Sequence, residues 1–204
     1  MGKMNLLKAA YTGKVGETVG AKWKDKNTIR VRTVPANPNT QAQQTVRGGF
    51  AEMSKFVSLF ADQIKTVSAL NTRGMSVRNA IMKLNKDMIA GGTLSPDALV
   101  ISSGGLPTPG GANPTAAQGT GAVTVPLTEV TGTNITDKCK LVVVVVAPSA
   151  NQGFVQIEDN STASVTVNTG ITGTKSLYVY VYALDYRGSA KVASASRAHE
   201  VTPA

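Results

Sequence analysis

The eight residues KLVVVVVA, at positions 140–147, decide the fold class of this chain. Five successive valines show no alternation of apolar and polar side chains, and this pattern is typical of a strand that is covered on both faces. A second stretch, LYVYVYAL at 177–184, alternates strictly, so that three tyrosines fall on one side of a strand and two valines and an alanine on the other. The two stretches predict the centre of a β-sheet protein.

Further strand patterns surround this centre. Candidate strands lie at 121–130, 140–147, 153–158, 163–168, 176–184 and 189–200, with turn residues between them. Because no helical pattern interrupts them, we predict an antiparallel β-sandwich of the immunoglobulin or fibronectin type at 121–204. We interpret the tyrosine row as cross-strand packing, with a binding face as the alternative.

A different periodicity governs residues 40–69. Apolar side chains recur there at spacings of four and three, which predicts a long amphipathic helix. A shorter stripe at 77–88 predicts a second helix, with Ser76 as its N-cap and Gly91-Gly92 as its end. Gly48 and Gly49 lie inside the first pattern and indicate either loose first turns or the close approach of another backbone. The stripe is either a core face or a seam between subunits, and its central members are Phe50, Met53, Val57, Phe60 and Ile64.

The stretch TGKVGETVGAKWKDKNTIRVR, at 12–32, is glycine-rich and basic, but it matches neither the P-loop nor the dinucleotide-binding spacing. It predicts two strands, 15–23 and 28–34, joined by a polar turn, with Trp23 packed into the module. We expect the hairpin to contact an acidic partner or a polyanion. The candidate contact residues are Lys14, Lys22, Lys24, Arg30 and Arg32.

The Gly- and Pro-rich stretch at 102–121 has no periodicity and predicts a linker. The predicted fold class is therefore α+β, in three parts. Residues 1–95 form a basic β-hairpin with a helical hairpin, residues 96–120 form the linker, and residues 121–204 form the sandwich.

Charge follows the same division. The chain of 204 residues carries a formal net charge of +9. Residues 1–95 contain 15 Lys and Arg against 5 Asp and Glu, whereas residues 96–204 contain 6 against 7. A basic half of this kind indicates an acidic or polyanionic partner, or else a solvated basic face.

Composition also argues against several classes of protein. One cysteine and one histidine provide neither an intrachain disulfide nor enough ligands for Cys/His zinc binding, and we expect no cofactor and no small-molecule substrate. No general base is visibly paired with a nucleophile, so we expect no enzymatic activity. We also expect no signal peptide and no membrane span, because no apolar run is long enough.

Several segments carry a resemblance to a known family: GKVGETVGAKWK, IRVR, VPANPNTQAQQTVRGGF, DKCKLVVVVVAPS and LYVYVYALDYRGSAKVASAS. In this order they resemble an uncharacterised family found in Bacteroidota and in associated phages and mobile elements. Its distinctive parts are the Gly-x-x-Gly-x-x-x-Gly-x-x-Trp-Lys opening and the Asn-Pro-x-Thr-x-x-Gln segment. The resemblance brings no catalytic residues and implies a phage or mobile-element setting.

From these observations we expect a structural subunit of a phage virion or a similar assembly, located in the virion. Its basic module would dock, and its sandwich would be displayed or contact other subunits. The expected partners are further copies, other virion proteins and packaged nucleic acid, without a membrane. The alternative is a nucleic-acid-binding protein that uses the basic N-terminal half.

Overall fold

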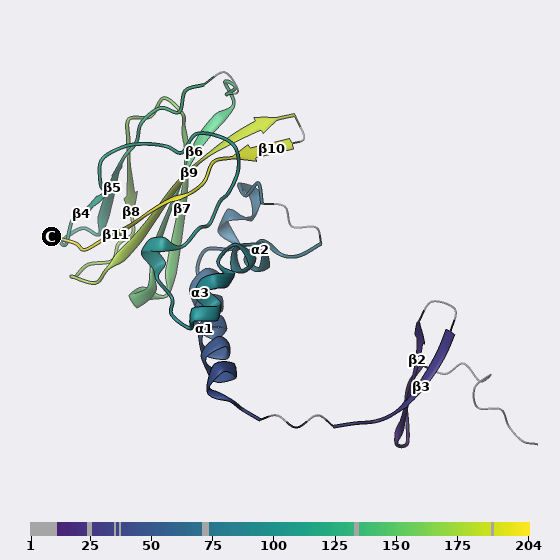
Figure 1. Ribbon diagram of the computed structural model, residues 1–204. Coiled ribbons are helices and arrows are strands. Elements are labelled where there is room, and N and C mark those ends of the chain that lie inside the picture. The colour runs from purple at the N-terminus through teal and green to yellow at the C-terminus, as the bar shows by residue number, and fades with distance from the viewer. Residues whose placement is uncertain are drawn as a thin grey trace, which may run out of the picture. The chain divides into compact units, whose positions relative to one another are not determined.

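The computed structural model describes residues 12–23, 26–34, 36, 38–70, 74–132, 135–188 and 190–204. The chain divides into two compact units, residues 1–40 and residues 41–204. Within the described part it forms three α-helices and eleven strands in antiparallel sheets, which confirms the predicted α+β class. Each unit is described separately below (Figure 1).

The first unit contains one three-stranded sheet in the order β1-β2-β3. Its strands are β1 (Gly13–Val15), β2 (Thr18–Trp23) and β3 (Lys26–Val31). The predicted hairpin is present as β2 and β3, although β3 begins earlier and ends earlier than expected. The strand β1 was not predicted, because its three residues include a glycine and offer too short a pattern to read.

The second unit contains a sandwich of two antiparallel sheets. The larger sheet has the order β10-β9-β6-β7, with β11 also paired to β9, and the smaller has the order β4-β5-β8. The strands are β4 (Thr115–Ala116), β5 (Ala122–Pro126), β6 (Cys139–Ala147), β7 (Gln152–Asp159), β8 (Ser164–Asn168), β9 (Leu177–Arg187), β10 (Ala190–Ala193) and β11 (Arg197–Val201). Two antiparallel sheets are thus present where the strand pattern predicts a sandwich, and this arrangement is compatible with the immunoglobulin or fibronectin type.

The valine side chains of the larger sheet fill the space between the two sheets. Val143 and Val145 on β6 and Val179 on β9 are fully buried there, together with Val123 and Val125 of the smaller sheet. Alternate residues of β6 point the opposite way, and they are also fully buried. The run of valines is therefore covered on both faces, as its lack of alternation indicates.

Helices cover the second face of the larger sheet. They are α1 (Gln41–Ser58), α2 (Val77–Leu84) and α3 (Lys86–Gly91), and they form a third layer beside the sandwich (Figure 1). Met53, Val57 and Phe60 pack in one core with Val142 and Val144 of β6. The sheet is thus the middle of three layers, which the sequence did not predict.

The tyrosine row of β9 faces this helical layer. The phenol of Tyr180 donates a hydrogen bond to the carbonyl of Pro96 at 2.6 Å, and that of Tyr182 donates to the carbonyl of Val67 at 3.2 Å. Tyr180 and Tyr182 are buried, and the ring of Tyr178 packs edge-on against Phe56 with 5.9 Å between centroids. The tyrosines therefore join the layers, in agreement with the packing interpretation.

The local signals of the helices are largely confirmed. Ser76 caps α2 by accepting a hydrogen bond from the backbone N–H of Asn79, and Gly92 ends α3 with a left-handed φ of 71°. The first helix ends at Ser58 rather than near residue 69, and the apolar pattern continues through the 3-10 turn Gln63–Thr66. Apolar spacing alone cannot distinguish one continuous α-helix from an α-helix followed by a 3-10 turn, because both bury the same residues.

The predicted division at residues 95 and 96 needs correction, because the boundary between compact units follows Thr40. The helices belong with the sandwich, since they share a core with its larger sheet. The predicted linker at 96–120 is packed: Leu99, Ile101 and Leu106 are buried. A Cβ on Gly104 would collide with the carbonyl oxygen of Ala193, so this glycine serves close packing rather than flexibility.

Candidate assembly surface

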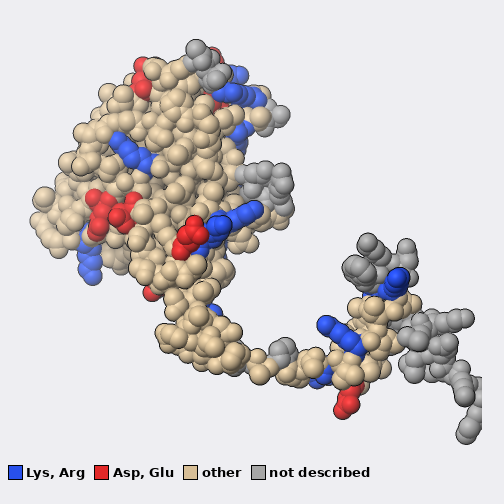
Figure 2. Space-filling model, in the orientation of Figure 1, with Lys and Arg blue, Asp and Glu red and all other residues tan. Residues whose placement is uncertain are grey.

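The strand register of the first unit places its side chains on two contrasting faces. Lys14 pairs with Val19, which pairs with Arg30, so these three residues lie in one row across the sheet. Lys26 lies on the same face as Arg30, because alternate residues of a strand share a face. One face of the sheet therefore carries three cationic residues, Lys14, Lys26 and Arg30. Lys and Arg side chains of this unit are seen in Figure 2.

The opposite face is apolar. Val31 pairs with Thr18, which also pairs with Val15, and Ile29 pairs with Gly20. Val15 is 59% exposed and Val31 is 71% exposed. Among the described residues of this unit only Gly20 is buried, so those residues supply no second layer over the apolar face of the sheet. A small sheet needs such a layer for independent stability.

The predicted contact residues divide between these faces. Lys14 and Arg30 lie together, whereas Lys22, which pairs with Asn27, belongs to the apolar face. Arg32 follows β3, and its backbone N–H donates to the carbonyl of Glu17 at 2.7 Å. Lys24 and the side chain of Trp23 lie outside the described residues. Lys26 was not predicted as a contact residue, because it was assigned to the polar turn between the two predicted strands.

The predicted helix seam is mostly internal. Met53, Val57, Phe60 and Ile64 are at most 1% exposed and contribute to the core between the helices and the sheet. Phe50 is different, since it is 54% exposed. Of the five seam residues only Phe50 is accessible to a partner.

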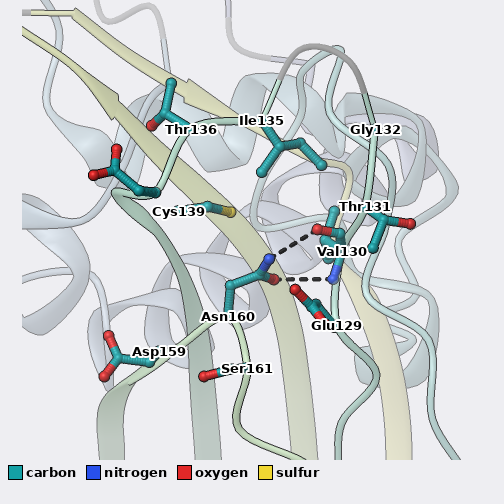
Figure 3. Close-up of a pocket in the computed structure, with 11 residues that line it drawn as sticks. Glu129, Val130, Thr131, Gly132, Ile135, Thr136, Cys139, Asp159, Asn160 and Ser161 are labelled. Atoms are coloured by element: carbon teal, nitrogen blue, oxygen red, sulfur yellow. Dashed lines mark hydrogen bonds between the residues drawn. The ribbon is translucent and has the colours of Figure 1, made fainter.

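A pocket of about 520 Å³ lies at the end of the sandwich beside the start of β6 (Figure 3). Asn160 closes one side: its Oδ1 accepts from the N–H of Val130 at 2.9 Å and its Nδ2 donates to the same residue's carbonyl at 2.8 Å. Cys139 lines the pocket but is buried. Burial, and then the negative charge of Asp185, raise the pKa of this thiol, so it stays protonated at neutral pH and is a poor nucleophile.

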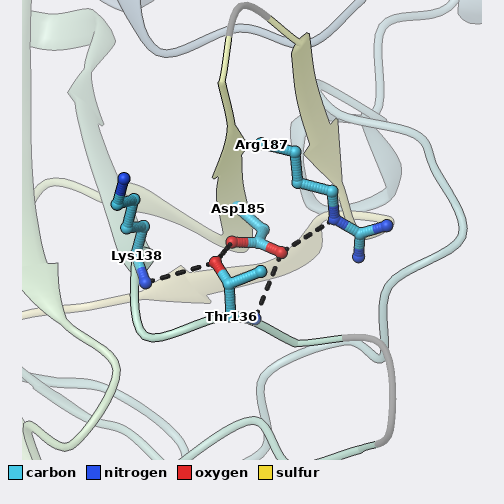
Figure 4. Close-up of polar contacts among 4 residues, drawn as sticks. All are labelled: Thr136, Lys138, Asp185 and Arg187. Carbon is cyan, nitrogen blue, oxygen red and sulfur yellow. Dashed lines mark hydrogen bonds and ion pairs between the residues drawn. The ribbon is translucent and has the colours of Figure 1, made fainter.

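Asp185 anchors the loop that leads into β6 (Figure 4). Its carboxylate is fully buried and accepts hydrogen bonds from the hydroxyl and backbone N–H of Thr136 and, at 3.0 Å, from Nε of Arg187. Burial acts to raise the pKa of Asp185, but these hydrogen bonds outweigh it and hold the pKa below its usual value. The ionised group is structural, because all its described contacts fix the loop to β9.

The only histidine of the chain lies on β11, which pairs with β9. His199 pairs with Val179, so it shares the inner face of the sheet, and its Nε2 is buried without a hydrogen-bond partner among the described residues. Burial, and then the charge of Arg197, lower the pKa of His199. Arg197 itself donates from Nη1 to the carbonyl of Gly111 at 2.6 Å.

Chemistry-bearing clusters are few in the described part of the chain. There, no group of three or more His, Cys, Asp or Glu is arranged to hold a metal ion. No helix among the described residues is long and apolar enough to cross a membrane. The best-defined candidate surface is therefore the two-faced sheet of the first unit.

Comparison with known proteins identifies the family to which the chain belongs. The model of a family described as a family of unknown function (DUF6266) matches residues 10–168, which cover most of both units. No curated protein matches the chain.

Proposed function

Because the chain belongs to this family of unknown function, we propose its role from the structure: a non-enzymatic structural subunit of a phage virion or a similar assembly. The first unit docks onto a neighbouring subunit, and the second unit is displayed or contacts other subunits. The phage setting rests on the resemblance of the sequence segments quoted above.

One observation carries the proposal: the described residues of the first unit leave the apolar face of its sheet uncovered. Val15 and Val31 are largely exposed, and no other layer lies over them in the described residues of that unit. A layer supplied by a neighbouring protein would remove this apolar surface from water, at about 25 cal/mol per Å². The second unit needs no such help, because its sandwich and helices bury two cores of their own.

The non-enzymatic part of the proposal is supported by the buried chemistry of the second unit. Cys139 is held as a protonated thiol, and the Nε2 of His199 is enclosed within the sheet packing. A protonated thiol is a poor nucleophile, and a buried Nε2 does not reach a substrate to remove a proton from it.

Mass spectrometry of purified particles tests the virion setting directly. Particles released from a host that carries this gene should contain the chain, and deletion of residues 1–40 should remove it from the particles while the second unit stays folded by circular dichroism. Absence of the full-length chain from particles, or incorporation of the deleted form, would contradict the proposal.

The cationic face supports a second candidate, a nucleic-acid-binding protein. Lys14, Lys26 and Arg30 share one face and offer three positive charges to phosphate groups. This candidate predicts that K14E/R30E weakens binding to DNA or RNA and that binding falls steeply with added salt. The structural subunit predicts instead that V15D/V31D abolishes assembly.

The two double variants distinguish the structural subunit from the nucleic-acid-binding protein, because they change opposite faces of one sheet. Light scattering after size-exclusion chromatography, with and without nucleic acid, measures both properties. The charge-reversal control is K138E, which changes an exposed lysine of the second unit. It should alter neither assembly nor nucleic-acid binding. Loss of nucleic-acid binding in K14E/R30E with unchanged assembly in V15D/V31D would favour the nucleic-acid candidate.

A further inference from the structure

The strand β7 forms an unprotected edge of the larger sheet. It is eight residues long and pairs only with β6. Among the described residues, the backbone of 152–158 forms no hydrogen bond other than those to β6. Ile157 is 47% exposed at this edge, beside an open hollow of about 670 Å³ between β7 and β8. An edge of this kind is a template for pairing with another strand.

Two of the other edges of the sandwich are covered or short. Along β10 and β11, the segment before β4 forms a parallel bridge from Leu106 to Ser194, and the N–H of Ser196 donates to the carbonyl of Ser102. At the smaller sheet, β4 has only two residues, and the N–H of Ala204 donates to its Ala116. The remaining edge strand, β8 of the smaller sheet, also pairs only with β5 but has five residues. The eight residues of β7 are therefore the longest open edge in the described part of the sandwich.

The sequence of β7 lacks the usual devices that prevent pairing. It contains no proline, no lysine and no positive-φ residue, and its two carboxylates, Glu158 and Asp159, lie together at one end. The middle of the strand, from Phe154 to Ile157, carries no charge. An approaching strand is therefore not repelled there.

The partner that fits this edge is a second copy of β7. In an antiparallel pair centred on Gln156, Val155 of each copy lies opposite Ile157 of the other, and Phe154 lies opposite Glu158. Val155 and Ile157 share the helix-covered face of the sheet, since they pair with Val144 and Val142, so the new contacts are apolar on that face. No carboxylate faces another carboxylate, because the acidic end of one strand meets the uncharged end of the other.

We propose that two copies of this chain associate through β7, about a two-fold axis at Gln156, to form one continuous sheet across both sandwiches. Such a pairing is isologous and closed, so it yields a dimer. This interface belongs to the second unit and is independent of docking by the first. In an assembly it would provide paired sandwiches.

Disulfide cross-linking of the full chain tests the position of the axis. In Q156C the two introduced cysteines would lie directly opposite each other, with Cα atoms about 4.5–5.5 Å apart, which suits a disulfide. We expect rapid formation of a covalent dimer on mild oxidation. The matched control is T115C, an exposed residue on the short edge strand β4, and the wild-type chain reports on the buried Cys139. Cross-linking of Q156C no faster than that of T115C overturns the proposal.

A charge placed at the edge provides an independent test. In the dimer, I157K places a lysine opposite Val155 at two symmetry-related positions. We expect the dissociation constant of this interface to rise at least about tenfold. T115K should leave it unchanged. Sedimentation measures the dissociation constant, and thermal melting confirms that both variants are folded. Unchanged association in folded I157K, or a wild-type chain that is monomeric at high concentration, also overturns the proposal.

Discussion

Buried ionisable side chains in the second unit are held in fixed protonation states by their surroundings. Asp185 is kept ionised by Thr136 and Arg187, whereas His199 is kept neutral by burial and by Arg197. The sequence did not predict either role, because the burial of both groups and the hydrogen bonds from Thr136 depend on segments that are distant in the sequence. His199 also makes stability sensitive to pH, since its protonation is easier in the unfolded chain.

The sign of this effect follows from the direction of the shift. The folded-state pKa of His199 lies below the ordinary value of 6.5, so the unfolded state binds a proton first as the pH falls. We expect the free energy of unfolding to fall below pH 6.5, by at most about 1.4 kcal/mol per pH unit for one proton. H199Q should reduce this dependence. Urea unfolding at pH 7.5 and 5.5 measures it, and equal pH dependence in both proteins would contradict the assignment.

At the scale of elements, the contact between α1 and α3 depends on glycine. A Cβ on Gly49 would lie 2.7 Å from the carbonyl oxygen of Ile89 and 2.9 Å from Cα of Gly92, whereas one on Gly48 would meet nothing within 4 Å. The adjacent glycines therefore have different roles. Gly49 permits close approach of the two helices, and Gly48 only lowers the helix propensity of α1.

Alanine substitutions at the two positions should change the free energy of unfolding in opposite directions. G48A should raise the free energy of unfolding by up to about 1 kcal/mol, because alanine favours the helix. G49A gains the same propensity but forces α1 away from α3, and we expect a net loss of about 1–3 kcal/mol. Chemical denaturation of both variants measures the difference. A stabilised G49A would show that the helices are not in close contact.

Prediction from sequence succeeded where the signal was local. The valine run of β6, the Ser76 cap and the Gly92 terminus are set by neighbouring residues, and all three were predicted. The covering of the larger sheet by helices could not be predicted, because it joins Phe60 to Tyr180 across most of the chain. The segment at 96–120 was predicted to be a linker because glycine and proline are frequent both in flexible linkers and in irregular segments that pack closely. The two faces of the first sheet required its register, which a glycine-rich sequence specifies weakly.

At the scale of the whole molecule, the boundary between units lies at Thr40. The described residues at 32–40 form no helix or strand and are exposed. By contrast, residues 99–106 are fixed against the sandwich by Leu106 and by the bond from Ser102 Oγ to the carbonyl of Ser194 at 2.8 Å. These two segments should differ in their susceptibility to proteases.

Limited proteolysis with a protease of broad specificity should therefore cut first at 32–40. We expect a resistant fragment that begins near residue 41 and contains both the helices and the sandwich, because proteases need exposed backbone without regular structure. Mass spectrometry identifies the cut sites. Earlier cleavage within 102–121 would restore the linker that the sequence predicted.

The three-layer packing has a consequence for synthesis on the ribosome. The apolar side of α1 emerges first, but the strands that bury it, β6 and β9, follow roughly 90 to 120 residues later, a delay on the order of ten seconds at typical elongation rates. During that interval Met53, Val57 and Phe60 have no sheet to cover them. The nascent chain should therefore bind chaperones that recognise apolar segments until residue 187 has been released. Pulse-labelled nascent chains stopped before and after β9 would show this binding and its loss.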